Sequence, residues 1–406
     1  MFKFTLLRFV DESDEWDSFK LGDVLDKKGY IRGPFGSALK RGEMKTEGIP
    51  VYEQQHAIYD NRLFRYYIDD NKFEELKRFQ VIPNDLIVSC SGTIGKTSLI
   101  RENDEKGIIS QALLILRSNS KIIEPKFLKY FLETNKGYNS LISSAGGSSQ
   151  VNIAKKQIIL DIPLVVPTLP TQHKIINFLD KISYKIELLE HKYEKYQDFK
   201  KYLMQQIFAQ KLRFNFIDDW DVVKLETLIE KGKAGGTPPS TNPDYYNGEI
   251  PFLSIKDMTE QGKYIVKTEK SITEEGLNNS SAWIIPKYSL LYSIYASIGL
   301  VSINLTEVST SQAIYGIILK EGVSLEYMYY YLTYFKKNIH RYVETGTQGN
   351  LNAKLLKSFE IALPSVDEQE MIVNILSLVD KKIENMEKEV GKMNEFKKGL
   401  LQQMFI

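Results

Sequence analysis

The stretch that decides the fold occurs twice in the chain. The segment "TQHKIINFLDKISYKIELLEHKYEKYQDFKKYLMQQIF" (residues 171–208) aligns without a gap with "EQEMIVNILSLVDKKIENMEKEVGKMNEFKKGLLQQMF" (residues 368–405), at an offset of 197. In both copies apolar residues recur in alternating steps of four and three, the heptad pattern of a helix that packs along a seam. The sequence therefore predicts two long helices of matching design. The seam residues are Ile175, Leu179, Ile182, Ile186, Leu189 and Leu203, and then Ile372, Leu376, Val379, Ile383, Met386 and Leu400.

One seam position in each copy carries a lysine, Lys200 or Lys397. A lysine within an apolar seam can fix the register of two helices at a cost in stability. It can also extend outward and cover apolar surface with its stem, and the sequence leaves both readings open. Two matched seams in one chain pack most simply on each other. Because a globular segment separates them, we expect antiparallel pairing, with a coiled coil to a second chain as the alternative.

The repeat extends into the segments that precede the helices. "IPVY" at Ile49 corresponds to "IPFL" at Ile250, and "SQALLIL" at Ser110 corresponds to "SQAIYGIIL" at Ser311. Internal repeats of this kind indicate duplicated architecture. We predict an α+β fold with an internal pseudo-twofold repeat, in which two mixed α/β globular domains are each followed by a long helix. The predicted boundaries are 1–165 and 213–363 for the domains, and 166–212 and 364–406 for the helices.

The stretch "SGTIGKTS" at Ser91 resembles the end of a phosphate-binding loop. The first glycine of such a motif would fall at Cys90, however, and the repeat partner "YASIGLVS" has Leu300 where the first copy has Lys96. A glycine-containing turn between two strands accounts for both copies. The sequence therefore predicts a turn and no nucleotide site.

The composition is that of a soluble globular protein, with 406 residues, 43% hydrophobic and 26% charged. The 53 basic and 52 acidic residues leave a net charge of +1, so a nucleic-acid surface would have to be a local patch. No apolar run is long enough to cross a membrane. A single cysteine excludes an internal disulfide and favours a cytoplasmic location. Four histidines and one cysteine show no ligand spacing, so no metal is predicted.

Catalytic signals are sparse. "GTPPST" at Gly236 is similar to the Pro-Pro site of amino-methyltransferases, but Thr237 precedes the prolines and Ser240 follows them, where an amide and an aromatic ring are needed. No glycine-rich loop suits a methyl-donor cofactor, and none of the histidines recurs in the other half. We therefore predict no catalytic residues and no cofactor.

The assembled pattern resembles the specificity subunit of type I restriction–modification enzymes. The resemblance rests on "GKAGGTPPSTNPDYYNGEIPFLSIKDM" (residues 232–258), the two glycine turns, the "SQA" pair, and "LPSVDEQEMIVNIL" (residues 363–376), and it covers essentially the whole chain. It implies two target recognition domains, each reading one half of a split target in double-stranded DNA, with the two helices as an antiparallel spacer. It also implies two modification (methyltransferase) subunits and two restriction/translocase subunits as partners, and no activity of the chain alone.

Where the second half has "GGTPPS", the first half has "RGPFGSALKRG", as expected of domains that read different half-sites. Sequence reading should therefore lie in polar residues at loop positions that do not repeat. Amide side chains suit adenine, lysine suits guanine, and aspartate accepts from cytosine, whereas other lysines hold phosphates. For each one, a solvated surface side chain is the alternative. The candidate DNA-binding residues are Lys40, Arg41, Lys45, Gln54, Gln55, His56, Lys96, Ser148, Ser149, Gln150, Lys231, Lys233, Lys256, Asp257, Thr347, Gln348 and Asn350.

Two other functional classes are alternatives to this hypothesis. A coiled-coil adaptor whose domains bind proteins has the same periodicity, but it would show no salt-sensitive DNA binding. A self-contained methyltransferase–endonuclease is disfavoured by the missing cofactor and metal motifs. The specificity subunit of a related type II system shares the same physics and stays open.

Overall fold

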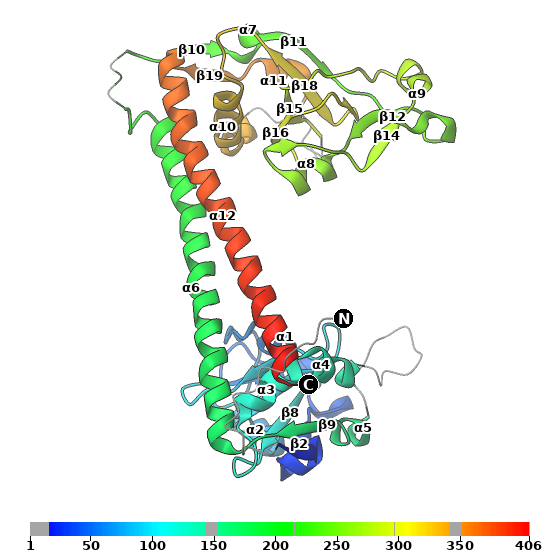
Figure 1. Cartoon of the computed structure of the whole chain (residues 1–406), viewed down its shortest axis with the longest axis vertical. Helices are drawn as coiled ribbons and strands as arrows, with labels where there is room; N and C mark the ends of the chain where they lie inside the picture. Colours follow the sequence, from blue (N-terminus) through cyan, green and yellow to red (C-terminus); the bar gives the residue numbers. More distant parts are fainter. Residues whose placement is uncertain are drawn as a thin grey trace. The chain divides into compact units, whose positions relative to one another are not determined.

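In a computed structural model, the chain forms two compact units, residues 1–190 with 388–406 and residues 191–387. The structure describes residues 16–405 except 143–152, 154, 215, 217, 296 and 342–350. Each unit contains one globular domain, one end of helix α6 (Leu169–Phe208) and the opposite end of helix α12 (Val366–Met404) (Figure 1).

The first domain is built on two sheets. The larger has the antiparallel order β2(Leu25–Arg32), β8(Leu113–Ser118), β5(Leu86–Ser89), β6(Thr97–Leu99), and the smaller the order β4(Tyr67–Ile68), β3(Ile49–Tyr52), β7(Ile108–Ile109). A separate pair, β1(Asp17–Lys20) with β9(Pro163–Val166), closes the domain next to α6. Its helices are α1(Gln54–Tyr59), α2(Asp70–Glu75), α3(Pro125–Glu133), α4(Asn135–Ile142) and α5(Lys156–Leu160).

The second domain repeats this plan. Its sheets have the orders β11(Ile229–Ala234), β18(Ile314–Leu319), β15(Leu290–Ser293), β16(Val301–Asn304), β13(Tyr264–Ile265), and β14(Lys270–Ile272), β12(Tyr246–Leu253), β17(Ser309–Thr310). The closing pair is β10(Asp221–Lys224) with β19(Glu360–Leu363). Its helices are α7(Leu225–Leu228), α8(Ile255–Gln261), α9(Glu274–Asn278), α10(Leu325–Phe335) and α11(Ala353–Lys357). The predicted α+β class and the internal repeat are confirmed.

The long helices pack antiparallel within each unit. In the first unit, Ile175 and Leu179 near the start of α6 share a buried core with Leu400 near the end of α12. In the second unit, Leu203 near the end of α6 shares a core with Ile372 near the start of α12. Of the twelve seam residues singled out above, nine are buried, and Leu189, Val379 and Ile383 are half-buried.

A buried glutamine at the start of each long helix connects it to its domain. The Oε1 atom of Gln172 in α6 accepts a hydrogen bond of 2.8 Å from the N–H of Glu124, which precedes α3. In the same way, Oε1 of Gln369 in α12 accepts one of 2.9 Å from the N–H of Ser324, which precedes α10. Both amides also donate to the carbonyl of the proline five residues earlier. The long helices therefore contact α3 and α10 in the same way.

The stretch that resembles a phosphate-binding loop is a turn between β5 and β6, as predicted. Its counterpart connects β15 and β16 in the same way. The serine that ends the first strand, Ser89 or Ser293, donates through its hydroxyl to the carbonyl four residues on and accepts from the N–H seven residues on. Gly95 (φ 76°) and Gly299 (φ 84°) close the turns in the left-handed region, which disfavours residues with a Cβ atom.

We expect Gly299→Ala to destabilise the second unit more than Gly322→Ala, a control that has the same φ of 84°. A positive φ costs alanine about 1–2 kcal/mol at either site. Only at Gly299 would the added Cβ atom also meet neighbours, the Ile339 side chain at 2.4 Å and that of Lys336 at 3.0 Å. Urea denaturation of the two variants measures the difference, and equal losses would contradict this steric account.

Candidate nucleic-acid interface

Parallel strand pairing brings two candidate segments together in each domain. In the first, β3 runs parallel to β7, with Val51 opposite Ile108, so the chain leaves both strands at the same edge. Helix α1 follows β3 and the "SQA" turn at Ser110 follows β7. In the second, β12 runs parallel to β17, with Leu253 opposite Thr310, and α8 and the second "SQA" turn follow them. The same pair of segments therefore meets twice.

In the first domain these segments line an open cleft of about 600 Å³ with Gln54, Gln55, Gln111 and Arg65 among its walls. Oε1 of Gln54 accepts a hydrogen bond of 3.2 Å from the Ser91 hydroxyl of the glycine turn. Nε2 of Gln55 donates to the carbonyl of Leu63 at 3.0 Å. Gln111 is exposed. Three amides, each with a donor and an acceptor, thus line one cleft, which is the chemistry that reads adenine.

Arg65 adds a cation to this cleft, and the sequence reasoning had not singled it out. Its side chain is 61% exposed and donates through Nε and Nη2 to the two carboxylate oxygens of Glu53, at 3.1 and 2.8 Å. The hydrogen bond that Arg65 donates to the Glu53 carboxylate raises the pKa of Arg65, so the guanidinium stays charged. Its neighbour Tyr66 lies beneath it, with the guanidinium carbon 5.4 Å from the ring centroid.

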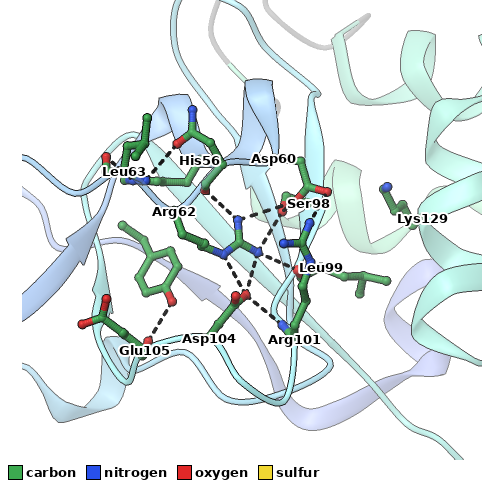
Figure 2. Close-up of polar contacts among 12 residues, drawn as sticks. His56, Asp60, Arg62, Leu63, Ser98, Leu99, Arg101, Asp104, Glu105 and Lys129 are labelled. Carbon is green, nitrogen blue, oxygen red and sulfur yellow. Dashed lines mark hydrogen bonds and ion pairs between the residues drawn. The ribbon is translucent and has the colours of Figure 1, made fainter. Parts of the chain in front are cut away.

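A second arginine holds the chain that leaves α1. Figure 2 shows the Arg62 guanidinium between Asp60, Asp104 and the β6 backbone. Nε donates to Asp104 at 2.7 Å, and Nη2 donates to the carbonyl of Leu99 at 2.8 Å. Arg101 adds an outer contact, from Nη2 to Asp60 at 2.8 Å. Since the Arg62 and Asp104 side chains are only 16% and 7% exposed, this cluster fixes α1 against the sheet.

The structure corrects the expectation that His56 and Asp257 contact DNA directly, because both are buried capping residues. They are the third residues of α1 and α8. Nδ1 of His56 accepts from the N–H of Glu53 at 2.7 Å, and Oδ2 of Asp257 accepts from the N–H of Ser254 at 2.8 Å. The Ser254–Asp257 spacing is that of a capping box, a signal present in the sequence.

Both capping side chains are held in one protonation state. Burial lowers the pKa of His56, and its Nε2 lies 3.1 Å from the carbonyl of Leu63, so the neutral ring with a proton on Nε2 fits both contacts. Burial acts to raise the pKa of Asp257, but hydrogen bonds from Ser254 and the Glu269 N–H outweigh it and hold the pKa below its usual value.

The lysines expected to hold phosphates are exposed in the first domain. Nζ of Lys45 pairs with Asp69 at 2.8 Å, and that contact lowers the pKa of the Asp69 carboxyl. Lys40 precedes a short 3₁₀ turn at Arg41–Glu43, and Lys96 stands at the end of the glycine turn. The Arg41 side chain lies outside the described part of the structure.

In the second domain a shallower cleft of about 450 Å³ is lined by Tyr295, Gln312 and Asn352 among others. The Thr237 hydroxyl donates to Oε1 of Gln312 at 2.5 Å, and Lys233 is exposed at the end of β11. The sequence reasoning did not include Gln111 and Gln312 of the "SQA" turns as DNA-binding candidates, because repetition was taken as a sign of architecture alone. Thr237 was considered only as part of the Pro-Pro stretch.

Two other candidate lysines of the second domain already have partners. Nζ of Lys256 pairs with Glu269 at 2.8 Å, and this contact raises the pKa of Lys256. Nζ of Lys231 lies 5.0 Å from the centroid of the Trp283 ring. Ser148, Ser149, Gln150, Thr347, Gln348 and Asn350 lie outside the described residues.

The structure also places the loop that departs most between the halves. The N–H of Gly33 donates to Leu113 and that of Gly235 to Ile314, both at 3.0 Å. A Cβ atom at either glycine would come within 2.0 or 2.1 Å of a carbonyl oxygen of the strand end opposite. "RGPFGSALKRG" and "AGGTPPS" are therefore equivalent loops that start at equivalent glycines.

Within the described residues no group of histidine, cysteine and carboxylate side chains has the geometry of a metal site, and no helix is long and apolar enough to cross a membrane. The thiol of Cys90 is buried, and burial raises its pKa to about 12. It therefore stays protonated near neutral pH, where a reactive cysteine needs a thiolate.

Comparison with known proteins identifies the family. Residues 13–197 and 217–392 each match the family model described as the type I restriction modification DNA specificity domain. These two matches cover most of the chain, so the chain belongs to this family. The predicted resemblance to specificity subunits is thereby confirmed.

Individual relatives agree with this assignment. The chain is 27% identical, over 96% of its length and 92% of the relative, to the putative type I restriction enzyme MjaX specificity subunit of Methanocaldococcus jannaschii. It is 35% identical to the MjaIX specificity subunit of the same organism, over 46% of this chain and 44% of that relative. The chain thus spans less than half of the MjaIX subunit in that match.

The fold is shared with solved structures. A chain from a study of complex assembly and conformational transition of the type I R-M system matches with a TM-score of 0.62 at 16% identity, over 96% of this chain and 97% of that one. The type I restriction–modification S subunit from M. genitalium matches with a TM-score of 0.55 at 16% identity, over 98% of both chains. At this identity the likeness concerns the fold alone.

We expect Arg62→Ala to destabilise the first unit by about 3 kcal/mol, because it leaves the buried Asp104 carboxylate without its main partner. The matched control is Arg101→Ala, an exposed pair whose loss should cost under about 1 kcal/mol. Urea denaturation, with hydrogen exchange read within residues 49–109, measures both. Similar losses for the two variants would show that Arg62 does not hold α1.

Protonation of His56 should weaken the first unit. Its folded-state pKa lies below the ordinary value of 6.5, so the unfolded chain binds the proton first. The stability contributed by His56 is therefore complete above about pH 6.5 and is lost as the pH falls. Thermal unfolding between about pH 5 and pH 8 should show this slope, and His56→Gln should flatten it. An equal slope in the variant would assign the pH dependence to other groups.

Proposed function

We propose that this chain is the non-catalytic DNA sequence-specificity subunit of a type I restriction–modification complex, and that each recognition domain reads one half of a split double-stranded target through the cleft beside its "SQA" turn. One observation carries the proposal. The same two segments meet at the same edge in both domains. The "SQA" turn is the same in both, but the residues that follow β3 and β12 and the loops around them differ. A bipartite target requires two domains of the same backbone plan with different side chains toward the DNA, at a spacing that geometry sets, as in dimeric DNA-binding proteins.

In the first domain, Gln54, Gln55 and Gln111 supply amides for the edge of adenine. Glu53 holds the Arg65 guanidinium through Nε and Nη2, which leaves the Nη1 donors for guanine. In the second, Gln312 with Thr237 and the exposed Lys233 take these roles. Exposed lysines such as Lys96 hold phosphates, which position the domain without reading sequence. The long helices act as the spacer that sets the gap between half-sites.

The partners follow from the family. We infer that two modification subunits bind along the helices and that two restriction/translocase subunits join through them in the cytoplasm. Exposed apolar side chains on the outer faces of the long helices support a helical partner. In α6 these include Tyr184, 61% exposed, and Leu188, 50% exposed, and in α12 they include Leu378, 69% exposed. Apolar residues one helical turn apart form the kind of stripe on which a further helix packs.

The first test is methylome sequencing of a host that expresses this chain with its modification subunit, compared with a host that lacks the chain. We expect methylation of a split motif with two short defined halves and a fixed gap. Exchange of residues 16–165 for those of another subunit should change one half only. A complex that assembles and methylates no defined motif would leave a protein-binding adaptor as the better reading.

Single substitutions then test the cleft. Gln111→Leu should relax the base preference at one position of one half-site by about ten- to a hundredfold, because a bidentate contact is worth about 1–3 kcal/mol. Lys96→Ala should weaken binding to all sequences alike and lower the salt dependence by about one unit of slope. DNA binding by the methyltransferase complex at several salt concentrations measures both. A uniform loss with Gln111→Leu would remove it from the reading surface.

A further inference from the structure

A tyrosine in the second unit connects the recognition domain to both long helices. Tyr330 of α10 is fully buried, and its hydroxyl donates to Oδ2 of Asp380 in α12 at 2.7 Å. The other carboxylate oxygen, Oδ1, pairs with Nζ of Lys200 in α6 at 2.5 Å. Lys200 is one of the two seam lysines, and here it neither extends into solvent nor lies unpaired. Asp380 thus links α10, α12 and α6 in one contact chain.

The first unit has the corresponding tyrosine, but its contact chain stops at one helix. Tyr130 of α3 donates to Oδ1 of Asp180 in α6 at 2.6 Å. The other oxygen of Asp180 is taken at 2.7 Å by Lys126, which is also in α3. Among the described residues no carboxylate forms an ion pair with the second seam lysine, Lys397 of α12. Its Nζ lies 5.6 Å from the centroid of the Tyr130 ring.

An exchange of two residues explains this difference. At the offset of 197 that aligns the helices, Asp180 corresponds to Ser377 and Ser183 corresponds to Asp380. Each unit therefore has one aspartate and one serine beside its tyrosine, in opposite order along the helix. The two positions are three residues apart, about 4.5 Å along the axis. Lys200 meets a carboxylate at the later position, whereas Lys397 lines a cleft in which the later position is Ser183.

The charged residue at the start of α3 or α10 agrees with the exchanged order of aspartate and serine. Lys126 in α3, which pairs with Asp180, corresponds to Glu326 in α10. Glu326 is paired with Nζ of Lys263 at 2.7 Å, and Nζ of Lys263 also donates to the Tyr330 hydroxyl at 3.0 Å. A carboxylate at position 377 would lie next to Glu326, so the later position is the favourable one in the second unit.

We propose that Asp380 and Lys200 are positioning residues that clamp the second recognition domain to both helices through polar contacts. The exchanged order at Asp180 and Ser183 leaves the polar contact chain of the first domain on α6 alone, and this domain meets α12 through apolar packing. The inference rests on the proposed function, in which the helices set the gap between half-sites. A directional hydrogen bond to α12 and the ion pair between α12 and α6 keep the second domain in a fixed register along both helices. The first domain meets α12 through apolar packing, which is non-directional, so it is the end that tolerates a change in gap.

Three variants of the full chain test this, each in complex with its modification subunit. Lys200→Met removes the clamp and leaves the Tyr330–Asp380 hydrogen bond in place. Lys397→Met is the matched control at the equivalent position. The double exchange Asp180→Ser with Ser183→Asp moves the carboxylate to the position equivalent to Asp380, which lines the same cleft as Lys397, without changing the composition. The readout is the ratio of methylation at targets with the natural gap to targets with a gap one base pair longer or shorter.

We expect Lys200→Met to lower this ratio about tenfold, which corresponds to about 1.4 kcal/mol, and Lys397→Met to leave it unchanged. The double exchange should raise it. A purely structural role predicts that methylation falls equally at all gaps, so an unchanged ratio with Lys200→Met would overturn the inference. Equal effects of the two lysine variants would overturn it too.

If the unaltered complex methylates no split target, the proposed function fails and the clamp is then decided by hydrogen exchange. Lys200→Met should speed amide exchange in α10, and the double exchange should slow it in α3, relative to the unaltered chain. If amide exchange in both α10 and α3 matches that of the unaltered chain, the inferred clamp is wrong, whether or not the chain reads DNA.

Discussion

Burial of the helix seam is the constraint on which the rest of the structure depends. A 40-residue helix with an apolar stripe gains most of its stability from the surfaces that cover the stripe. In each unit two surfaces do so, the antiparallel end of the other long helix and the recognition domain itself. Phe127 of α3, Leu179 of α6 and Leu400 of α12 lie in one core. At about 1.5–3 kcal/mol for each large buried side chain, the domain and the two helix ends stabilise one another.

The contacts that join each domain to the long helices lie apart from the cleft that is proposed to read DNA. Contacts that join domain to helix recur in both units, as with the buried amides of Gln172 and Gln369 and the hydroxyls of Tyr130 and Tyr330. Apart from the glutamine of each "SQA" turn, the clefts carry different side chains on the same backbone plan. Under the proposed function, substitutions in a cleft can therefore change the sequence that is read while the contacts between domain and helix are kept.

The sequence predicted what depends on local periodicity. The heptad steps gave the two helices, because that signal lies within a few residues. The paired motifs gave the repeat and the turn at Gly95, because each motif is a short contiguous stretch that can be matched to its copy. The cleft was out of reach, since Gln54 and Gln111 meet only through the parallel pairing of β3 with β7, and no local pattern encodes which strands pair. His56 and Asp257 were assigned to DNA because polar residues after a strand were taken as loop. The capping spacing from Ser254 to Asp257 was the available signal that these segments are helical.

The seam lysines show why alignment alone understates the asymmetry of a duplicated chain. Side by side, the two copies present Lys200 and Lys397 as equivalent, and the pairs Asp180–Ser377 and Ser183–Asp380 as two unrelated mismatches. The antiparallel packing within each unit brings the lysine of one long helix close to these aspartate and serine positions of the other. Lys200 of α6 thus meets Asp380 of α12, and Lys397 of α12 lines the cleft that holds Asp180 and Ser183 of α6. Each helix therefore has one aspartate and one serine at these two positions, but the aspartate comes first in α6 and second in α12. In the second unit the lysine of the opposite helix meets a carboxylate, whereas in the first unit the carboxylate stands three residues earlier and pairs with Lys126. The same residue types therefore give one domain a polar contact chain to both helices and the other domain a polar contact chain to α6 alone.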